Sequence, residues 1–198
     1  MPQIDLNSKL TDSLSPAGYD LLNFNPAAAY TKLVVTGGGN PEALPLLKST
    51  EPQTLLTKPI TSKADADAML SGLWLWHDWL DPSHRISQDL HSSTGSFWHA
   101  IMHRREGDFS NAKYWYARVG NHPVLASMAP FASDVINQQP ADKSFLKLIR
   151  DGWDPDVFVD LAEALHNKPS DPRHGAVVAL QRIEWRLLFD HCTRAASA

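Results

Sequence analysis

The residues that decide the fold of this 198-residue chain are 97–120, FWHAIMHRREGDFSNAKYWYARVG. Gly107 can adopt the left-handed conformation that ends a helix, and Asp108 can cap the helix that follows. The stretch therefore predicts two helices, over residues 96–106 and 109–119, joined by a tight turn. Two helices connected so closely pack against each other as a hairpin.

Similar signals predict further helices on both sides of this hairpin. Three Asp-Pro steps, in which aspartate caps a helix and proline takes its first position, are found at Asp81-Pro82, Asp154-Pro155 and Asp171-Pro172. Helices are predicted over residues 62–80, 123–136, 143–150 and 172–194. The second half of the chain shows no alternating strand pattern. The predicted fold class is therefore all-α, a single-domain helical bundle over residues 62–198.

Residues 1–61 differ in composition from the rest of the chain. They contain half of the 14 prolines and the run Gly37-Gly38-Gly39. Prolines at this spacing shorten helices and remove hydrogen-bond donors from strands. We predict an irregular Pro/Gly-rich N-terminal arm with short helical turns at residues 26–33 and 41–47. Its apolar residues indicate that the arm packs on the body.

The overall composition excludes several classes of protein. The net charge is −4, which gives no electrostatic basis for binding nucleic acid. Cys192 is the single cysteine, so an intrachain disulfide and a thiolate zinc site are excluded. No apolar run approaches the ~20 residues that a membrane span needs, and the N-terminus does not read as a secretory signal. We expect a cytoplasmic protein with no membrane partner.

Histidine and tryptophan are unevenly distributed along the sequence. Of the nine histidines and seven tryptophans, five of each lie between residues 74 and 115. We predict that the tryptophans of the 74–79 segment belong to the core, because tryptophan buries a large area. The histidines are the first place to look for a functional site.

The 96–119 hairpin resembles a tetratricopeptide helical hairpin. The turn Gly107-Asp108-Phe109 matches, and Ala100 and Ala112 fall on the two small positions where the helices of that family approach closely. Histidines stand where the family usually has Leu and Tyr. The resemblance covers one repeat, whereas a stable solenoid needs about three. It therefore implies a local hairpin of similar shape.

A broader resemblance, over residues 64–195, is to an uncharacterised family of bacterial and fungal helical proteins. The segments that carry it are GLWLWHDWLD (72–81), GSFWHAIMHRRE (95–106), NAKYW (111–115), GNHP (120–123) and IEWRLLFDHC (183–192). This resemblance implies a helical domain and brings no activity with it.

The spacing of His99, His103 and Glu106 is the sharpest chemical signal in the sequence. Residues at i, i+4 and i+7 lie on one stripe of a helix, and two imidazoles one turn apart can bind one metal ion. The pattern lacks the glutamate that directly follows the first histidine of zinc proteases. These three residues are candidate ligands of a divalent metal. Further ligands are sought among His77, Asp78, Asp81 and His84.

Two other interpretations of these histidines stay open. His99 and His103 can be hydrogen-bonded core residues, which then share a neutral network or pair with a carboxylate such as Glu106 or Glu184. They can also form a metal-free polar or catalytic site. Glu184 lies among leucines and needs a cationic, metal or hydrogen-bonding partner.

Cations and aromatic residues of the hairpin suggest a second kind of site. Arginine and aromatic side chains together can line a pocket for an anion or a nucleotide, although an ordinary solvated face has the same pattern. The full set of binding candidates is His77, His84, Trp98, His99, His103, Arg104, Arg105, Glu106, Tyr114, Trp115 and Arg118.

Two functions are compatible with these observations. The first is a soluble binding or interaction module that holds a small molecule or a peptide in a groove between the residue 64–91 helices and the hairpin. The second is a metal-dependent or histidine-based enzyme centred on His99 and His103. The enzyme hypothesis requires at least three candidate side chains to converge near an accessible cavity, and the binding hypothesis requires an open groove.

Overall fold

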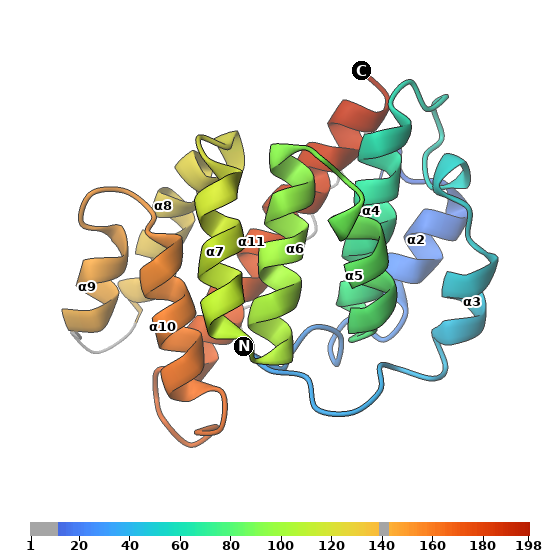
Figure 1. The fold of residues 1–198 in the computed structure, drawn as a ribbon. Helices are drawn as coiled ribbons and strands as arrows, with labels where there is room; N and C mark the ends of the chain where they lie inside the picture. Colours follow the sequence, from blue (N-terminus) through green and yellow to red (C-terminus); the bar gives the residue numbers. More distant parts are fainter. Residues whose placement is uncertain (1–11, 139–142) are drawn as a thin grey trace.

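The predicted hairpin lies at the centre of the computed structural model of this protein (Figure 1). It consists of α6 (Ser93–Glu106) and α7 (Phe109–Val119). The structure describes residues 12–138 and 143–198, and no β-strand is found among them. The predicted all-α fold class is thus confirmed.

Eight further helices surround the hairpin in the described ranges. They are α2 (Pro16–Asn23), α3 (Leu44–Ser49), α4 (Lys63–Trp76), α5 (Leu80–Gln88), α8 (Pro123–Ile136), α9 (Lys143–Ile149), α10 (Pro155–Leu165) and α11 (His174–Ala196), with a 3₁₀ turn at Pro52–Thr54. Helix α5 packs on α6, and α10 packs on α7. The long α11 passes behind the hairpin and contacts both α4 and α8 (Figure 1). None of the described helices is both long and apolar enough to cross a membrane.

The turn of the hairpin has the predicted chemistry. Gly107 has a φ of 90°, in the left-handed region that glycine adopts at little cost, and the Asp108 carboxylate accepts a hydrogen bond from the Asn111 backbone N–H. Helix α6 begins three residues earlier than predicted because Ser92 caps it through the Gly95 N–H. The hairpin therefore places residues 93–106 on one continuous helix.

The largest error in the predicted elements concerns residues 76–82. The helix predicted to reach Leu80 ends at Trp76, and α5 begins at Leu80, ahead of the predicted start at Asp81-Pro82. Between them Asp78 has a φ of 64°. Arg105, on α6, donates to both the Leu75 carbonyl and the Asp78 carboxylate. A tertiary contact thus accompanies this break, and it turns α5 back along α6.

The other Asp-Pro steps gave one correct and one shifted helix start. Asp154 caps α10 by accepting hydrogen bonds from two backbone N–H groups. At the second step, Asp171 accepts from the Arg173 backbone N–H, and α11 begins only at His174. The predicted start of that helix at Pro172 is therefore two residues early.

The described part of the arm, residues 12–61, packs on α4. The Trp76 indole donates to the Leu22 carbonyl at 3.1 Å, and the Tyr30 ring stacks on Trp76. The turn predicted at 26–33 is a hydrogen-bonded turn at residues 26–30, not a helix, and the one predicted at 41–47 is α3. Helix α2 was missed.

Tryptophan forms much of the core, as its clustering predicts. Trp74 and Trp76 are buried, whereas Trp79 is only partly buried and donates its indole N–H to the Asn40 carbonyl. Trp98 and Trp185 complete the centre of the core, with ring centroids 6.2 Å apart.

Candidate functional site

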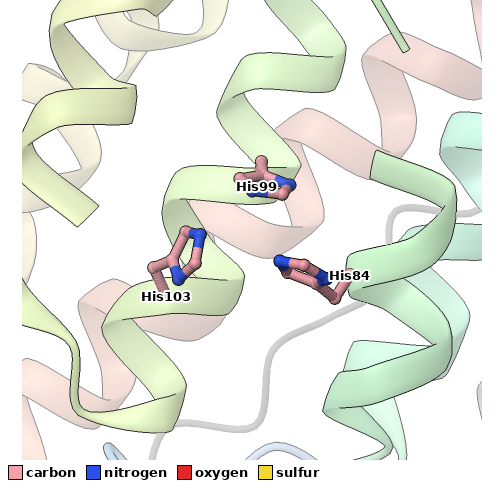
Figure 2. A group of neighbouring side chains, drawn as sticks. All are labelled: His84, His99 and His103. Atoms are coloured by element: carbon pink, nitrogen blue, oxygen red, sulfur yellow. The ribbon is translucent and has the colours of Figure 1, made fainter. Parts of the chain in front are cut away.

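Three histidines from two helices converge between α5 and α6. His99 and His103 lie one turn apart on α6, and His84 faces them from α5 (Figure 2). The ring centroids are 4.6 Å apart for His99 and His103, and 4.7 and 5.4 Å from His84 to His99 and His103. One ring nitrogen of each residue lies within 4.8 Å of the other two. We refer to these three residues as the histidine cluster.

A serine hydroxyl sets the orientation of the His99 ring. Ser87 Oγ donates to the His84 backbone carbonyl at 3.2 Å and lies 2.9 Å from His99 Nδ1. Because the single hydroxyl proton is used for the carbonyl, Nδ1 of His99 donates to Ser87 Oγ. The lone pair of His99 Nε2 is therefore left for another partner.

A carboxylate sets the orientation of the His103 ring. Glu106 Oε1 lies 2.5 Å from His103 Nδ1, so the Nδ1–H group donates to the carboxylate and Nε2 carries the lone pair. The Asn111 side-chain amide nitrogen lies 3.1 Å from that Nε2 atom and supplies a donor to it. Metal-ligating histidines are commonly held in this way, with an oxygen acceptor on the ring nitrogen that does not bind the ion.

Burial keeps the His99 imidazole uncharged at neutral pH. His99 is 3% exposed, and its pKa is lowered to about 4 by burial first, and then by the nearby His103 and His84. A neutral imidazole is the form that binds a metal ion. His84 is half-buried, and neither of its ring nitrogens has a hydrogen-bond partner among the described residues. It is therefore the accessible member of the cluster.

Two buried arginines fix the rotation of α6. Arg104 donates to Glu184 on α11, with Nη2 2.5 Å from Oε2, and to the Tyr116 hydroxyl on α7. Arg105 points the other way, toward Asp78, and its guanidinium carbon lies 3.9 Å from the centre of the Tyr30 ring. Arg104 and Arg105 are thus held on other faces of α6, and the face that carries His99 and His103 is directed toward α5.

Three of the predicted binding candidates, Trp98, Arg104 and Arg105, do not line an open groove. All three side chains are fully buried, so none of them reaches solvent or a ligand. The Trp98 indole donates to Cys192 Sγ, while the arginines are neutralised by Glu184 and Asp78. The alternative prediction of a solvated basic face is wrong for the arginines as well. Glu184, however, has the cationic partner that its sequence context requires.

His77 does not join the cluster. Its Nε2 atom lies 2.8 Å from the Leu21 carbonyl, and burial lowers its pKa. Of the other ligands considered with it, Asp78 pairs with Arg105 and Lys32, and Asp81 is exposed. Among the described residues, the histidine that completes the cluster is thus His84.

Glu106 lies beside the cluster and not within it. Its carboxylate belongs to a second, more exposed group with His103 and Asp108. Asp108 already accepts hydrogen bonds from Ser110 and from the Asn111 backbone as the cap of α7. We therefore assign Glu106 to orienting His103, in place of its predicted role as a direct metal ligand.

Two of the remaining candidates, Trp115 and Arg118, line a surface pocket of about 390 Å³ beside the cluster. Its lining residues are Gln88, Leu90, His91, Ser92, Ser93, Ser96, Trp115 and Arg118. The Trp115 ring also packs on His99, with centroids 4.3 Å apart. Arg118 and Tyr114 are exposed at the same end of α7. An opening thus exists next to the predicted histidines, between the end of the residue 64–91 segment and the hairpin, and Trp115 is the predicted lining residue that faces it.

Sequence reasoning missed Ser87 and Asn111. Ser87 follows His84 by three residues, a spacing that puts both on one side of a helix, and this was the available signal. Asn111 lies in the first turn of α7, where its contact with His103 depends on how the hairpin closes.

Comparisons of this chain with protein families, with curated proteins and with solved structures found no match.

Proposed function

We propose that this protein binds a divalent transition-metal ion, with zinc the best fit, through His84, His99 and His103, and uses its open coordination position for chemistry on a small molecule. The observation that carries the proposal is the convergence of three imidazoles whose ring nitrogens lie within 4.8 Å of one another. With Zn–N bonds of about 2.0–2.1 Å, the nitrogens of a tetrahedral zinc site are about 3.3 Å apart, which is within this limit.

The hydrogen bonds around the rings support a metal site over a simple core packing. Ser87 and Glu106 hold the Nδ1–H groups of His99 and His103, so both Nε2 atoms carry the lone pair. A metal ion on His103 would displace the Asn111 amide from that Nε2 atom. His84 brings a third ring that the fold leaves without a hydrogen-bond partner among the described residues.

The ligand set points to catalysis more than to a structural role for the ion. Structural zinc sites have four protein ligands, while catalytic sites have three and keep a position open for water or substrate. Three neutral ligands leave the full 2+ charge on the ion, which then polarises a carbonyl or phosphoryl oxygen, or acidifies a bound water.

A metal-free binding module is the second candidate function. The pocket beside Trp115 and Arg118 favours it, because a cavity of this size accommodates a small molecule. The two candidates differ in one measurable respect, since the binding module needs no ion and is indifferent to loss of His84.

Zinc titration of the protein tests the proposal. The chain is purified without a histidine tag, stripped of metal, and titrated with ZnCl₂ by calorimetry at pH 7. We expect one ion per chain and its loss in His84→Ala, which removes a half-buried ligand with little effect on the core. Ser87→Ala should weaken zinc binding about tenfold, as is usual when the hydrogen bond that orients a ligand is lost.

His174→Ala is the matched control, because this histidine lies at the start of α11, outside the histidine cluster. Equal zinc binding by the wild type and the His84→Ala variant, or no binding by either, would refute the proposed metal site. Elemental analysis of the protein as purified then identifies the ion that it carries.

A further inference from the structure

The pocket next to the histidine cluster is lined by α5 and α6, which carry the cluster, by the segment between them and by α7. It lies where the C-terminal end of α5 and the N-terminal end of α6 meet α7. Gln88 follows His84 by one turn on α5, and Ser96 precedes His99 by one turn on α6. Residues one turn apart share a side of a helix, so the pocket continues the inter-helix space that contains the histidines.

Trp115 connects the pocket to the cluster. Its side chain lines the pocket, and its ring packs on His99 with centroids 4.3 Å apart. His99 in turn contacts the His84 and His103 rings. A molecule in the pocket is therefore separated from the His99 imidazole by the Trp115 indole ring.

The lining of the pocket has the chemistry of an anion site. It contains Arg118 and no carboxylate. The guanidinium carbon of Arg118 lies over the Trp115 and Tyr114 rings, 5.3 and 5.8 Å from their centres, and Nη1 donates to the Tyr114 hydroxyl at 3.5 Å. A guanidinium held in this way presents its N–H edge for a two-point contact with a carboxylate or a phosphate.

Additional donors in the pocket have no competing partner in the described structure. The side chains of Gln88, His91 and Ser96 make no hydrogen bond with another described residue, whereas Ser93 donates to the Val119 carbonyl. Leu90 and the Trp115 ring supply apolar wall. Polar donors around one cation, with an apolar wall beside them, suit a small organic anion.

We propose that this pocket binds the anionic group of the substrate of the metal site, a small molecule that carries a carboxylate or a phosphate. Arg118 holds the oxyanion, Leu90 and Trp115 contact the apolar part of the molecule, and the reacting group extends past Trp115 toward His84. This inference rests on the proposed metal-dependent function, which it deepens by naming the substrate class. The anion site itself requires no metal.

Binding of three matched probes tests the proposal. Phenyl phosphate, benzoate and the neutral benzamide are titrated calorimetrically into metal-free protein and into protein loaded with Zn²⁺. We expect one or both anions to bind the metal-free protein, and benzamide to bind at least tenfold more weakly, because it lacks the charge that Arg118 recognises. The two anionic probes separate a phosphate substrate from a carboxylate substrate.

Arg118→Gln should weaken binding of the preferred anion about tenfold or more, since it removes a charge-assisted contact on an exposed side chain that the fold does not need. Arg194→Gln, an exposed arginine paired with Asp190 at the far end of α11, is the control and should change nothing. Loading with Zn²⁺ should raise the affinity for the anion, because the ion and the pocket form one site.

Failure of both anions to bind, equal binding of benzamide, or indifference to Arg118→Gln overturns the anion site. If protein that holds zinc binds the anion no more tightly than metal-free protein does, the pocket and the metal site do not form one substrate site. A protein that binds no zinc can still bind the anion, because anion binding is also measured in metal-free protein. Failure of the metal site and failure of the anion site are therefore distinguishable.

Discussion

Protonation of single histidines links the histidine cluster to the stability of the fold. The pKa of His99 is lowered to about 4, by burial and by two neighbouring imidazoles, and that of His122 is lowered to about 4 by burial and by His191. In the unfolded chain both residues return to about 6.5. The folded state therefore binds fewer protons than the unfolded state between these two values.

The sign of the pH dependence follows from this difference. At neutral pH the His99 and His122 imidazoles are neutral in the folded and in the unfolded state, so they do not reduce the free energy of unfolding. As the pH falls from about 6.5 through 4, the unfolded state gains protons first, so the free energy of unfolding decreases through this window. Below pH 4 these two residues cause no further loss.

Urea unfolding measured at pH 7.0, 5.5 and 4.5 checks the prediction. His99→Gln should reduce the slope of the free energy of unfolding against pH, because one of the two titrating groups is gone. His91→Gln is the control, since this histidine is exposed. A slope that is the same in wild type and His99→Gln would show that His99 does not titrate in the predicted window. Added zinc should stabilise the wild type more at pH 7.0 than at pH 4.5, because a metal ion binds the neutral form of an imidazole.

The orientation of α6 depends on a buried ion pair with α11. Arg104 and Glu184 are both fully buried, and Tyr116 donates to the second carboxylate oxygen at 2.8 Å. Opposite charges in a dry core are strongly coupled, and removal of one leaves the other without compensation. Since His103 is the neighbour of Arg104 on α6, this pair also supports the position of the site.

Glu184→Gln should lower the free energy of unfolding by about 3 kcal/mol, because the Arg104 guanidinium then stays buried without a counter-charge. Chemical denaturation at pH 7 measures the change. Lys63→Gln, which breaks an exposed pair with Asp67, should cost less than about 0.5 kcal/mol. Equal effects of the two substitutions would mean that the core pair is not neutralised as described.

Local capping chemistry explains why most helices were predictable. Ser62, Asp108, His122 and Asp154 each accept a backbone hydrogen bond at the start of a helix, and these signals lie within a few residues of each other in sequence. The break after Trp76 was not predictable in this way. It is accompanied by hydrogen bonds from Arg105, a residue almost thirty positions away.

The same limit applies to the candidate site. The spacing of His99 and His103 on one helix is a local property, so the sequence was sufficient to single them out. Selecting His84 over His77 required knowledge of where α4 ends and how α5 returns along α6. The burial of Arg104 and Arg105 could not be predicted from the local sequence either, because the tertiary fold brings their partners Glu184 and Asp78 to them.

In the molecule as a whole, the irregular arm and the helical body share one core. Tyr30 of the arm is fully buried, stacks on Trp76 and is covered by the Arg105 guanidinium. Arg105 also donates to the Lys32 carbonyl, and the Val35 N–H donates back to the Arg105 carbonyl. The arm therefore closes the end of α6 that carries His103, and it should unfold together with the body.

Tyr30→Ala tests this cooperativity. Removal of a fully buried aromatic ring should lower the free energy of unfolding by about 3 kcal/mol or more, since it leaves a cavity between Trp76 and Arg105. Tyr19→Ala, on the same arm but 46% exposed, should cost much less. Urea denaturation followed by tryptophan fluorescence and by circular dichroism should give one coincident transition for both variants. Two separated transitions, or equal costs for the two tyrosines, would show instead that the arm is an independent unit, because only a ring that belongs to the common core destabilises the whole molecule when it is removed.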